Sequence, residues 1–262
     1  EYGGPAIEAL DMEGRLAVCN MSIEGGARAG YINPDETTFE YLEGREYVPE
    51  GEAFEELKAY WESIASDDDA EYDDVVTVDA GGIDPLVTWG INPGQVIEIS
   101  EPVPEPSSFE ARTDREAAAS ALEHMEIEPG QSMLGYEVDV AFLGTCTNGR
   151  VSDFEEAAAV LEGHTVGDGV RALAVPGSET VRKECEARGI DETFINAGFQ
   201  WRRAGCSMCL AMNDDMLEGD EVCASSSNRN FVGRQGSKEG RTVLMSPAMV
   251  AAAAVEGAVT DA

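Results

Sequence analysis

Strand-forming and helix-forming segments alternate through the second half of this sequence. Short apolar runs at 138–143 and 171–175 predict strands, and a helix is expected after each of them. Ser152 and Ser178 are the expected caps of those two helices, and Ser246-Pro247 predicts the start of a further helix. Strands and helices that alternate at these lengths are typical of layered α/β folds. The sequence therefore predicts an α/β fold with a mostly parallel sheet.

A proline-rich stretch divides the sequence. Pro102, Pro104 and Pro106 lie in the segment Glu-Pro-Val-Pro-Glu-Pro, which predicts an extended spacer. We therefore expect two domains, one over 1–106 that includes the spacer and one over 107–262.

Weaker local signals lie on both sides of this boundary. Apolar residues at helical spacing predict a helix over 54–64, and β-branched residues predict short strands at 77–78 and 96–99. Thr113 and Glu116 have the spacing of a capping box, which predicts that a helix begins there.

The charge of the chain is strongly negative. It has 52 acidic against 17 basic residues and a formal net charge of -35, which excludes a binder of nucleic acid or of an anionic membrane. With 43% hydrophobic residues, the chain nevertheless has enough apolar side chains for a folded core. Only three of the basic residues are lysines, and we interpret this surface as that of a halophilic protein in a salt-rich cytoplasm. The acidic run 67–69 lacks the pattern of a calcium loop and is interpreted as a solvated face.

The cysteines point to a metal centre. No stretch reaches the length of about 20 apolar residues that a membrane span needs, so a cytoplasmic location is expected and six cysteines there favour thiol chemistry over disulfides. Cys146 follows a predicted strand, and Cys206 and Cys209 form a C-x-x-C pair. Three thiolates could hold a four-iron cluster with one open iron, or a zinc ion. Spacing alone leaves both possibilities open, and His124 and His164 do not decide between them.

The segments around these cysteines resemble the aconitase family of iron-sulfur hydro-lyases. Within that family, the similarity is greatest to the large subunits of the 3-isopropylmalate dehydratases, and it covers nearly the whole chain. The segments that carry the resemblance are 144–150, 197–199, 205–210, 227–234, 18–24 and 35–39.

The resemblance implies roles for eight residues. Cys146, Cys206 and Cys209 correspond to the three ligands of a 4Fe-4S cluster, on which a hydroxy acid loses and regains water. Asn228, Arg229 and Arg234 correspond to residues that bind the carboxylates of a small dicarboxylate substrate, and Asn20 to one beside the cluster. Glu24 corresponds to an acid-base or water-orienting residue. The implied architecture consists of three-layer α/β/α subdomains.

The resemblance also implies missing parts. Large subunits of this family carry upstream active-site residues, so we expect this sequence, which begins at Glu1, to be the C-terminal part of a longer subunit. The catalytic serine belongs to a separate small swivelling subunit, without which the chain is expected to be inactive. Two alternatives are an aconitase- or homoaconitase-type enzyme with the same mechanism, and a non-catalytic module that holds zinc through the same three cysteines.

Overall fold

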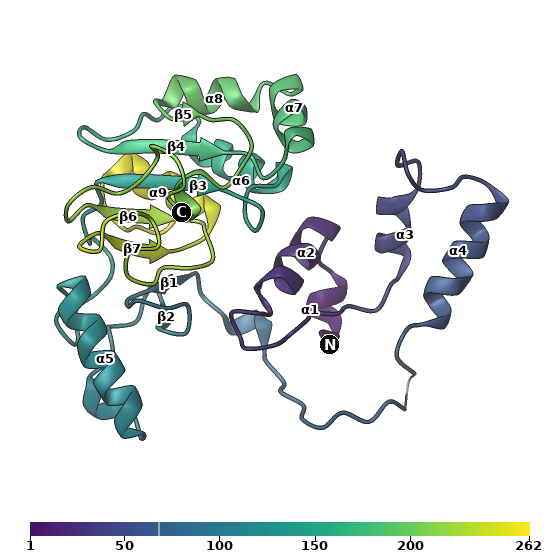
Figure 1. Cartoon of the computed structure of the whole chain (residues 1–262), viewed down its shortest axis with the longest axis horizontal. Helices are drawn as coiled ribbons and strands as arrows, with labels where there is room; N and C mark the ends of the chain where they lie inside the picture. The colour runs from purple at the N-terminus through teal and green to yellow at the C-terminus, as the bar shows by residue number, and fades with distance from the viewer. Residues whose placement is uncertain (68) are drawn as a thin grey trace. The chain divides into compact units, whose positions relative to one another are not determined.

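Figure 1 shows the computed structural model, which describes residues 1–67 and 69–262. The chain divides into two packing units, Glu1–Gly82 and Ile83–Ala262. The division lies well ahead of the boundary expected near residue 106, because the spacer packs within the second unit. There Val103 is buried, its N–H donates to the carbonyl of Gln131, and its own carbonyl accepts from Gly130. The interpretation of the acidic run 67–69 includes Asp68, which lies outside the described residues.

The first unit contains short helices. They are α1 (Pro5–Glu8), α2 (Met12–Met21), α3 (Glu36–Leu42) and α4 (Glu52–Ser63), followed by the 3-10 turn η1 (Ala80–Gly82). Helix α4 corresponds to the helix predicted over 54–64. Its buried Phe54 packs on its own Trp61, and the buried Phe39 of α3 packs on Trp61 as well. The strand predicted at 77–78 is wrong: this stretch is exposed and has no regular secondary structure, and no second strand pairs with it among the described residues. Its β-branched residues have no apolar surface to pack against.

The second unit is built on a five-stranded parallel sheet in the order β5-β4-β3-β6-β7. This arrangement confirms the α/β class, and it confirms strands at the two apolar runs 138–143 and 171–175. Beside the sheet, two further strands form an antiparallel pair, and one of them overlaps the strand predicted at 96–99. The strands are β1 (Leu86–Thr88), β2 (Val96–Glu98), β3 (Val140–Gly144), β4 (Arg171–Val175), β5 (Gln200–Trp201), β6 (Val222–Ser225) and β7 (Arg241–Leu244).

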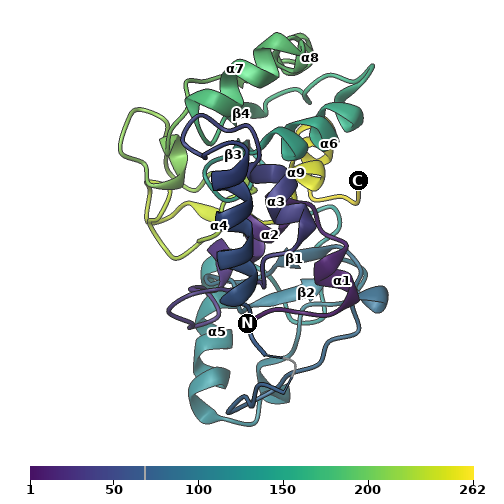
Figure 2. The same cartoon turned by 90° about the vertical axis from the view of Figure 1, so that its right-hand side faces the viewer.

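Side chains of β3 alternate between two apolar layers, as expected for a strand. Ala141 and Leu143 join the larger core with helices α6 (Val151–Leu161), α8 (Ile190–Ala197) and α9 (Pro247–Glu256). Figures 1 and 2 show α6 and α9 side by side. Val140 and Phe142 face the opposite way, and a loop that contains Met208, Cys209 and Leu217 covers them. One layer over this sheet is therefore helical, and the layer on the other face is a loop with the 3-10 turn η3 (Ser207–Cys209).

Two of the four N-terminal helix caps predicted from the sequence are present in the structure. Ser178 caps α7 (Glu179–Ala187) by accepting from the Val181 N–H, and Ser246 caps α9 in the same way. The expected cap Ser152 is wrong, because the Asp153 carboxylate accepts from the Arg150 N–H at 2.8 Å and α6 begins at Val151.

The capping box expected from Thr113 and Glu116 is wrong as well. Helix α5 (Arg112–Met125) begins one residue earlier, its cap Ala111 has no side-chain acceptor, and Glu116 pairs with Arg112 at 2.7 Å. The proline spacer ends in the 3-10 turn η2 (Pro106–Ser108), which precedes α5. Among the described residues, no helix combines the length and the apolar character needed to cross a membrane.

Candidate metal centre

The sheet has its topological switch point between β3 and β6. From β3 the chain moves outward to β4, whereas from β6 it moves in the other direction to β7. The loops that leave the carboxyl ends of two such strands diverge and leave a crevice, where parallel sheets usually bind ligands. Cys146 lies in the loop after β3, and the segment with Asn228, Arg229 and Arg234 follows β6.

The Cys146 loop is held in place by hydrogen bonds from its backbone and from one of its side chains. The Gly144 N–H donates to the Ser226 hydroxyl at 2.9 Å, and the Thr145 N–H donates to the Val175 carbonyl at 3.0 Å. The Asn148 side chain donates to the Ser226 carbonyl at 2.8 Å. The loop with Cys146 is thus tied to the end of β4 and to the loop after β6, and Cys146 itself is exposed.

Two glycines make this close approach possible. A Cβ on Gly144, whose φ is +136°, would lie 1.9 Å from the Val175 carbonyl oxygen, and a Cβ on Gly149 would lie 2.4 Å from that of Thr145. Thr145 itself adopts a φ of +83°, which is costly for a β-branched residue and is tolerated only where the surroundings impose it. The loop therefore stores strain next to a candidate ligand.

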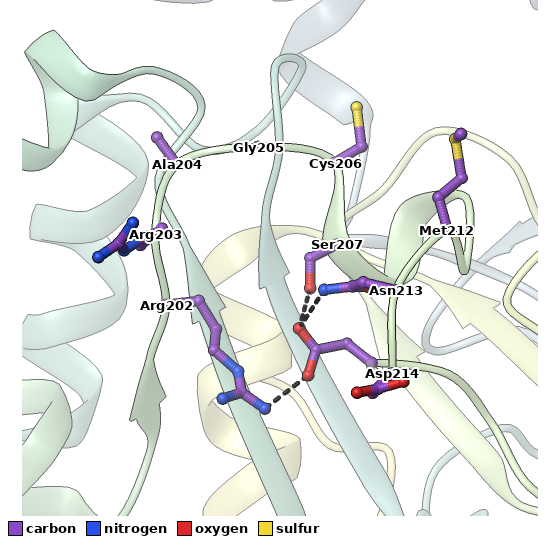
Figure 3. A pocket seen from close by; sticks show the side chains of 10 residues that line it. Arg202, Arg203, Ala204, Gly205, Cys206, Ser207, Met212, Asn213 and Asp214 are labelled. Carbon is purple, nitrogen blue, oxygen red and sulfur yellow. Dashed lines mark hydrogen bonds and ion pairs between the residues drawn. The ribbon is translucent and has the colours of Figure 1, made fainter.

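The C-x-x-C pair lies in a second loop, after β5. The Arg202 N–H donates to the Ala174 carbonyl of β4 at 2.9 Å, which anchors the start of this loop to the sheet. Cys206 is exposed, whereas Cys209 is buried beneath the turn, and the Cys209 N–H donates to the Cys206 carbonyl at 2.9 Å. Ser207, between them, has a φ of +42°. Figure 3 shows Cys206 and Ser207 at the edge of a pocket of about 670 Å³.

The Cys209 thiol lies within electrostatic range of the other two candidate ligands. Burial raises the pKa of the Cys209 thiol, and the neighbouring Cys146 and Cys206 thiols raise this pKa further. The Arg234 guanidinium opposes both effects because its Nη2 donates to the Cys209 sulfur at 3.8 Å. The structure thus brings the three cysteines and one arginine into a single neighbourhood. Among residues 1–67 and 69–262, no three His, Cys, Asp or Glu side chains meet closely enough to hold a single metal ion.

The segment after β6 is anchored by Asn230. Its buried amide donates to the Gly90 carbonyl at 2.7 Å and to the Thr242 carbonyl at 3.2 Å. Asn228 and Arg229, just before this anchor, are half-buried, and Arg234, after it, lies over the Phe231 ring as well as beside Cys209. The two predicted arginines therefore extend from a segment whose position is fixed by a buried side chain.

Asn20 and Glu24 belong to the first unit. Asn20 is exposed near the end of α2, and the Glu24 N–H donates to the Met21 carbonyl in the turn that follows. Their participation in the same site as the cysteines stays a prediction.

Sequence reasoning missed three polar residues around the cysteines. Asp215 is buried and accepts hydrogen bonds beside the C-x-x-C pair, and Ser226 braces the Cys146 loop. Thr145 is 1% exposed, and its hydroxyl oxygen has no hydrogen-bond partner in the part of the chain that the structure describes. The sequence gives no signal for the first two residues, because Asp215 is one of 52 acidic residues and Ser226 lies within a run of serines.

Comparison with known proteins identifies the family. Residues 1–257 match the model of the Aconitase family (aconitate hydratase). Over its full 262 residues, the chain is 65% identical to the 3-isopropylmalate dehydratase large subunit of Halorubrum lacusprofundi and 63% identical to that of Haloferax volcanii, and it covers 55% of each. It is 62% identical to the protein of the same name from Salinibacter ruber, of which it covers 56%. The chain thus spans about half the length of these curated relatives. Because the match runs through both cysteine loops and both packing units, the chain belongs to the aconitase family.

Proposed function

We propose that this chain is part of the large subunit of a 3-isopropylmalate dehydratase and that Cys146, Cys206 and Cys209 hold a 4Fe-4S cluster. The observation that carries the proposal is that Arg234, from the segment after β6, donates to the Cys209 sulfur, and that Cys146 and Cys206 lie near enough to Cys209 to raise its pKa. The names and identities of the relatives support the same activity.

The residues fit a cluster chemically. Three thiols are the ligand type that iron-sulfur clusters require, and each thiolate binds a different iron, so the sulfurs do not have to meet at one point. The buried Thr145 hydroxyl, which precedes Cys146, is an unpaired donor of the kind that hydrogen bonds to cluster sulfur would satisfy. When bound, a cluster with three protein ligands supplies one open iron that acts as a Lewis acid on a hydroxyl group.

The side chains of this chain then bind and orient the substrate. Arg229 and Arg234 present planar guanidinium groups suited to carboxylates, and Asn228 can donate a further hydrogen bond. Glu24 would hold or move a proton, and Asn20 would bind the substrate beside the cluster. The substrate class that follows is a small hydroxy dicarboxylic acid, isomerised by loss and return of water.

The proposal includes partners and surroundings. A small subunit that carries the catalytic serine completes the enzyme, in line with relatives named large subunits. The net charge of -35 supports a halophilic, cytoplasmic protein without a nucleic-acid or membrane partner. Citrate or homocitrate as substrate is the alternative within the same mechanism.

Anaerobic reconstitution tests the metal centre. We expect about four irons and four sulfides per chain, and each of Cys146→Ala, Cys206→Ala and Cys209→Ala should lower that content. Cys19→Ala is the matched control, because Cys19 is a half-buried cysteine of the first unit. A protein that takes up one zinc and no sulfide would reject the cluster and favour the zinc module.

Substrate binding is tested in the complete enzyme with its small subunit. Arg229→Lys keeps the positive charge but loses the planar fork, so we expect turnover of 2-isopropylmalate to fall by at least about tenfold while iron content stays unchanged. Unchanged turnover would contradict the role of Arg229, and turnover of citrate or homocitrate alone would replace the proposed substrate.

A further inference from the structure

The carboxylate of Asp215 is the hydrogen-bonding centre of the C-x-x-C loop. Asp215 is 7% exposed, and its two oxygens serve different partners. Oδ1 accepts from Arg202 Nη2 at 2.5 Å, and Oδ2 accepts from the Ser207 hydroxyl at 2.6 Å and from Asn213 Nδ2 at 3.1 Å. Figure 3 draws the dashed lines that start at the labelled Arg202, Ser207 and Asn213. A buried carboxylate with three donors is fixed in position, since hydrogen bonds to an ionised acceptor are strong.

These contacts connect the sheet to the strained turn. Arg202 is anchored through its own N–H to β4, and its guanidinium reaches Asp215. On the other side, Asp215 holds the hydroxyl of Ser207, the residue with a φ of +42° between Cys206 and Cys209. A left-handed serine is unfavourable unless its surroundings fix it. In this loop, the Ser207 hydroxyl donates its hydrogen bond to the Asp215 carboxylate, which therefore helps to fix the conformation of Ser207.

The two cysteines differ in what fixes them. Cys209 is buried in the apolar layer with Phe142 and Met208, so packing restrains its sulfur. Cys206 is exposed, so the direction of its sulfur depends on the backbone of the turn. A brace on Ser207 therefore matters most for Cys206.

We propose that Asp215 is a positioning residue of the metal centre. It acts through Ser207, whose backbone it holds in the conformation that directs the Cys206 sulfur toward the cluster. This proposal rests on the proposed function, because the group that the Cys206 sulfur faces is the proposed cluster. The hydrogen bonds of Asp215 to Arg202 and Ser207, which we call the brace, lie within the chain and do not depend on the cluster.

An amide cannot replace this carboxylate. In Asp215→Asn one of the two positions becomes an NH₂ group, which must face either the Arg202 guanidinium or the Asn213 NH₂ group, neither of which can accept a hydrogen bond, although the Ser207 hydroxyl can. At least one hydrogen bond is lost while side-chain volume is kept. Asp214→Asn is the matched control, because Asp214 is the neighbouring residue, is exposed, lines the same pocket and undergoes the same change of charge.

The first measurement needs no cluster. In metal-free protein, we expect Asp215→Asn to speed hydrogen exchange of the Cys209 amide, which donates within the turn, by about tenfold relative to wild type and Asp214→Asn. Equal exchange in all three proteins would overturn the brace, whether or not the protein binds a cluster.

The second measurement uses the anaerobically reconstituted protein. We expect Asp215→Asn to release iron to a chelator about tenfold faster and to change the EPR spectrum of the reduced cluster, with Asp214→Asn like wild type. Release and spectrum like wild type, together with faster amide exchange, would limit Asp215 to a role in the turn and overturn its role at the metal. Failure of the wild type itself to incorporate iron and sulfide would refute the proposed function instead, because the exchange result is independent of it.

Ser207→Ala tests whether Asp215 acts through Ser207. It is also a milder variant, because Asp215 keeps its hydrogen bonds to Arg202 and Asn213 when the Ser207 hydroxyl is removed. If Asp215 acts through Ser207, the double variant Ser207→Ala/Asp215→Asn releases iron no faster than Asp215→Asn alone. Multiplying effects would show that Asp215 acts by another route. Where Asp215→Asn fails to fold, an iron release and EPR spectrum of Ser207→Ala like those of wild type would overturn the proposal.

Discussion

The two loops that carry the cysteines reach the same neighbourhood by different means. The Cys146 loop is braced by backbone groups, through glycines that admit the Val175 and Thr145 carbonyls and a serine that accepts from Gly144. The C-x-x-C loop is braced by the side chain of Asp215, which spans from Arg202 to Ser207. Both loops contain a strained non-glycine residue next to a cysteine. The same strain is thus maintained once by close packing of the main chain and once by a buried charge.

This difference has a consequence for tolerance to change. Where backbone packs closely against backbone, there is no room for a side chain. A substitution there causes a steric clash that disturbs the whole edge of the sheet. A side-chain brace fails locally, because the surrounding loop can adjust to its loss.

Gly144→Ala should destabilise the protein most. Its Cβ would lie 1.9 Å from the Val175 carbonyl oxygen at a φ of +136°, so we expect the free energy of unfolding to fall by at least about 3 kcal/mol, or the protein to be insoluble. Gly205→Ala is the matched control in the other loop, since a Cβ added there would meet no described atom within 4 Å apart from those of its chain neighbours. We expect it to cost about 1 kcal/mol from its φ of +157° alone, by chemical denaturation. Equal losses for the two variants would remove the steric part of the contrast.

Ser226→Ala should have the next largest effect. It leaves the buried Gly144 N–H without its acceptor at 2.9 Å, and an unsatisfied buried donor costs about 1–3 kcal/mol. Ser207→Ala removes a hydroxyl from a half-buried donor whose acceptor keeps two other partners, so a loss of less than about 1 kcal/mol is expected. Denaturation midpoints at constant m-value measure both variants. A larger loss for Ser207→Ala would reverse the ranking of the two braces.

The parts of this design that the sequence predicts are the local ones. The strand 171–175 and the caps Ser178 and Ser246 depend on neighbouring residues alone, and they are confirmed. The strand at 77–78 failed because strand formation needs a partner that local composition does not specify. The capping box of Thr113 failed because α5 begins one residue earlier and Glu116 pairs with Arg112.

The candidate site divides in the same way. Its cysteines and arginines follow from ordered motifs, whereas Asp215 is one of 52 acidic residues until folding brings it to Arg202 and Ser207. Burial of a carboxylate is a property of the tertiary structure, and the spacing of residues in the sequence does not predict it. The brace of the Cys146 loop by Ser226 is hidden for the same reason, since 82 residues separate its two partners.

The third prediction concerns thiol reactivity in metal-free, reduced protein. Burial raises the pKa of Cys209, so its thiol stays neutral to higher pH, and the thiolate that reacts with iodoacetamide forms later. Below its pKa, the labelling rate should rise about tenfold per pH unit, since the thiolate fraction does so. We expect half-maximal rate at a higher pH for Cys209 than for a cysteine in an unfolded peptide from the same segment, measured by mass spectrometry.

Arg234 gives this experiment its control. The Arg234 guanidinium lowers the pKa of Cys209, so Arg234→Met should move the midpoint of labelling to still higher pH, and the exposed Cys146 and Cys206 report whether reagent access has changed. A Cys209 midpoint at or below that of the peptide would contradict the burial of this thiol.

The smallest effect is expected from salt. Arg202, one end of the Asp215 brace, has a side chain 39% exposed, so added salt should screen this ion pair, whereas the neutral hydrogen bonds of the Cys146 loop are insensitive to it. Salt also changes the stability of the whole acidic chain, but both loops lie in one unit, so the ratio of their exchange rates cancels that change. Between 0.2 and 2 M KCl, we expect exchange of the Cys209 amide to rise about twofold relative to that of Thr145, because salt reaches the pair only from its half-exposed Arg202 side and removes only roughly a few tenths of a kcal/mol. A ratio independent of salt would mean that the brace at Asp215 works through its hydrogen bonds alone, and the contrast between the loops would then be one of geometry and not of charge.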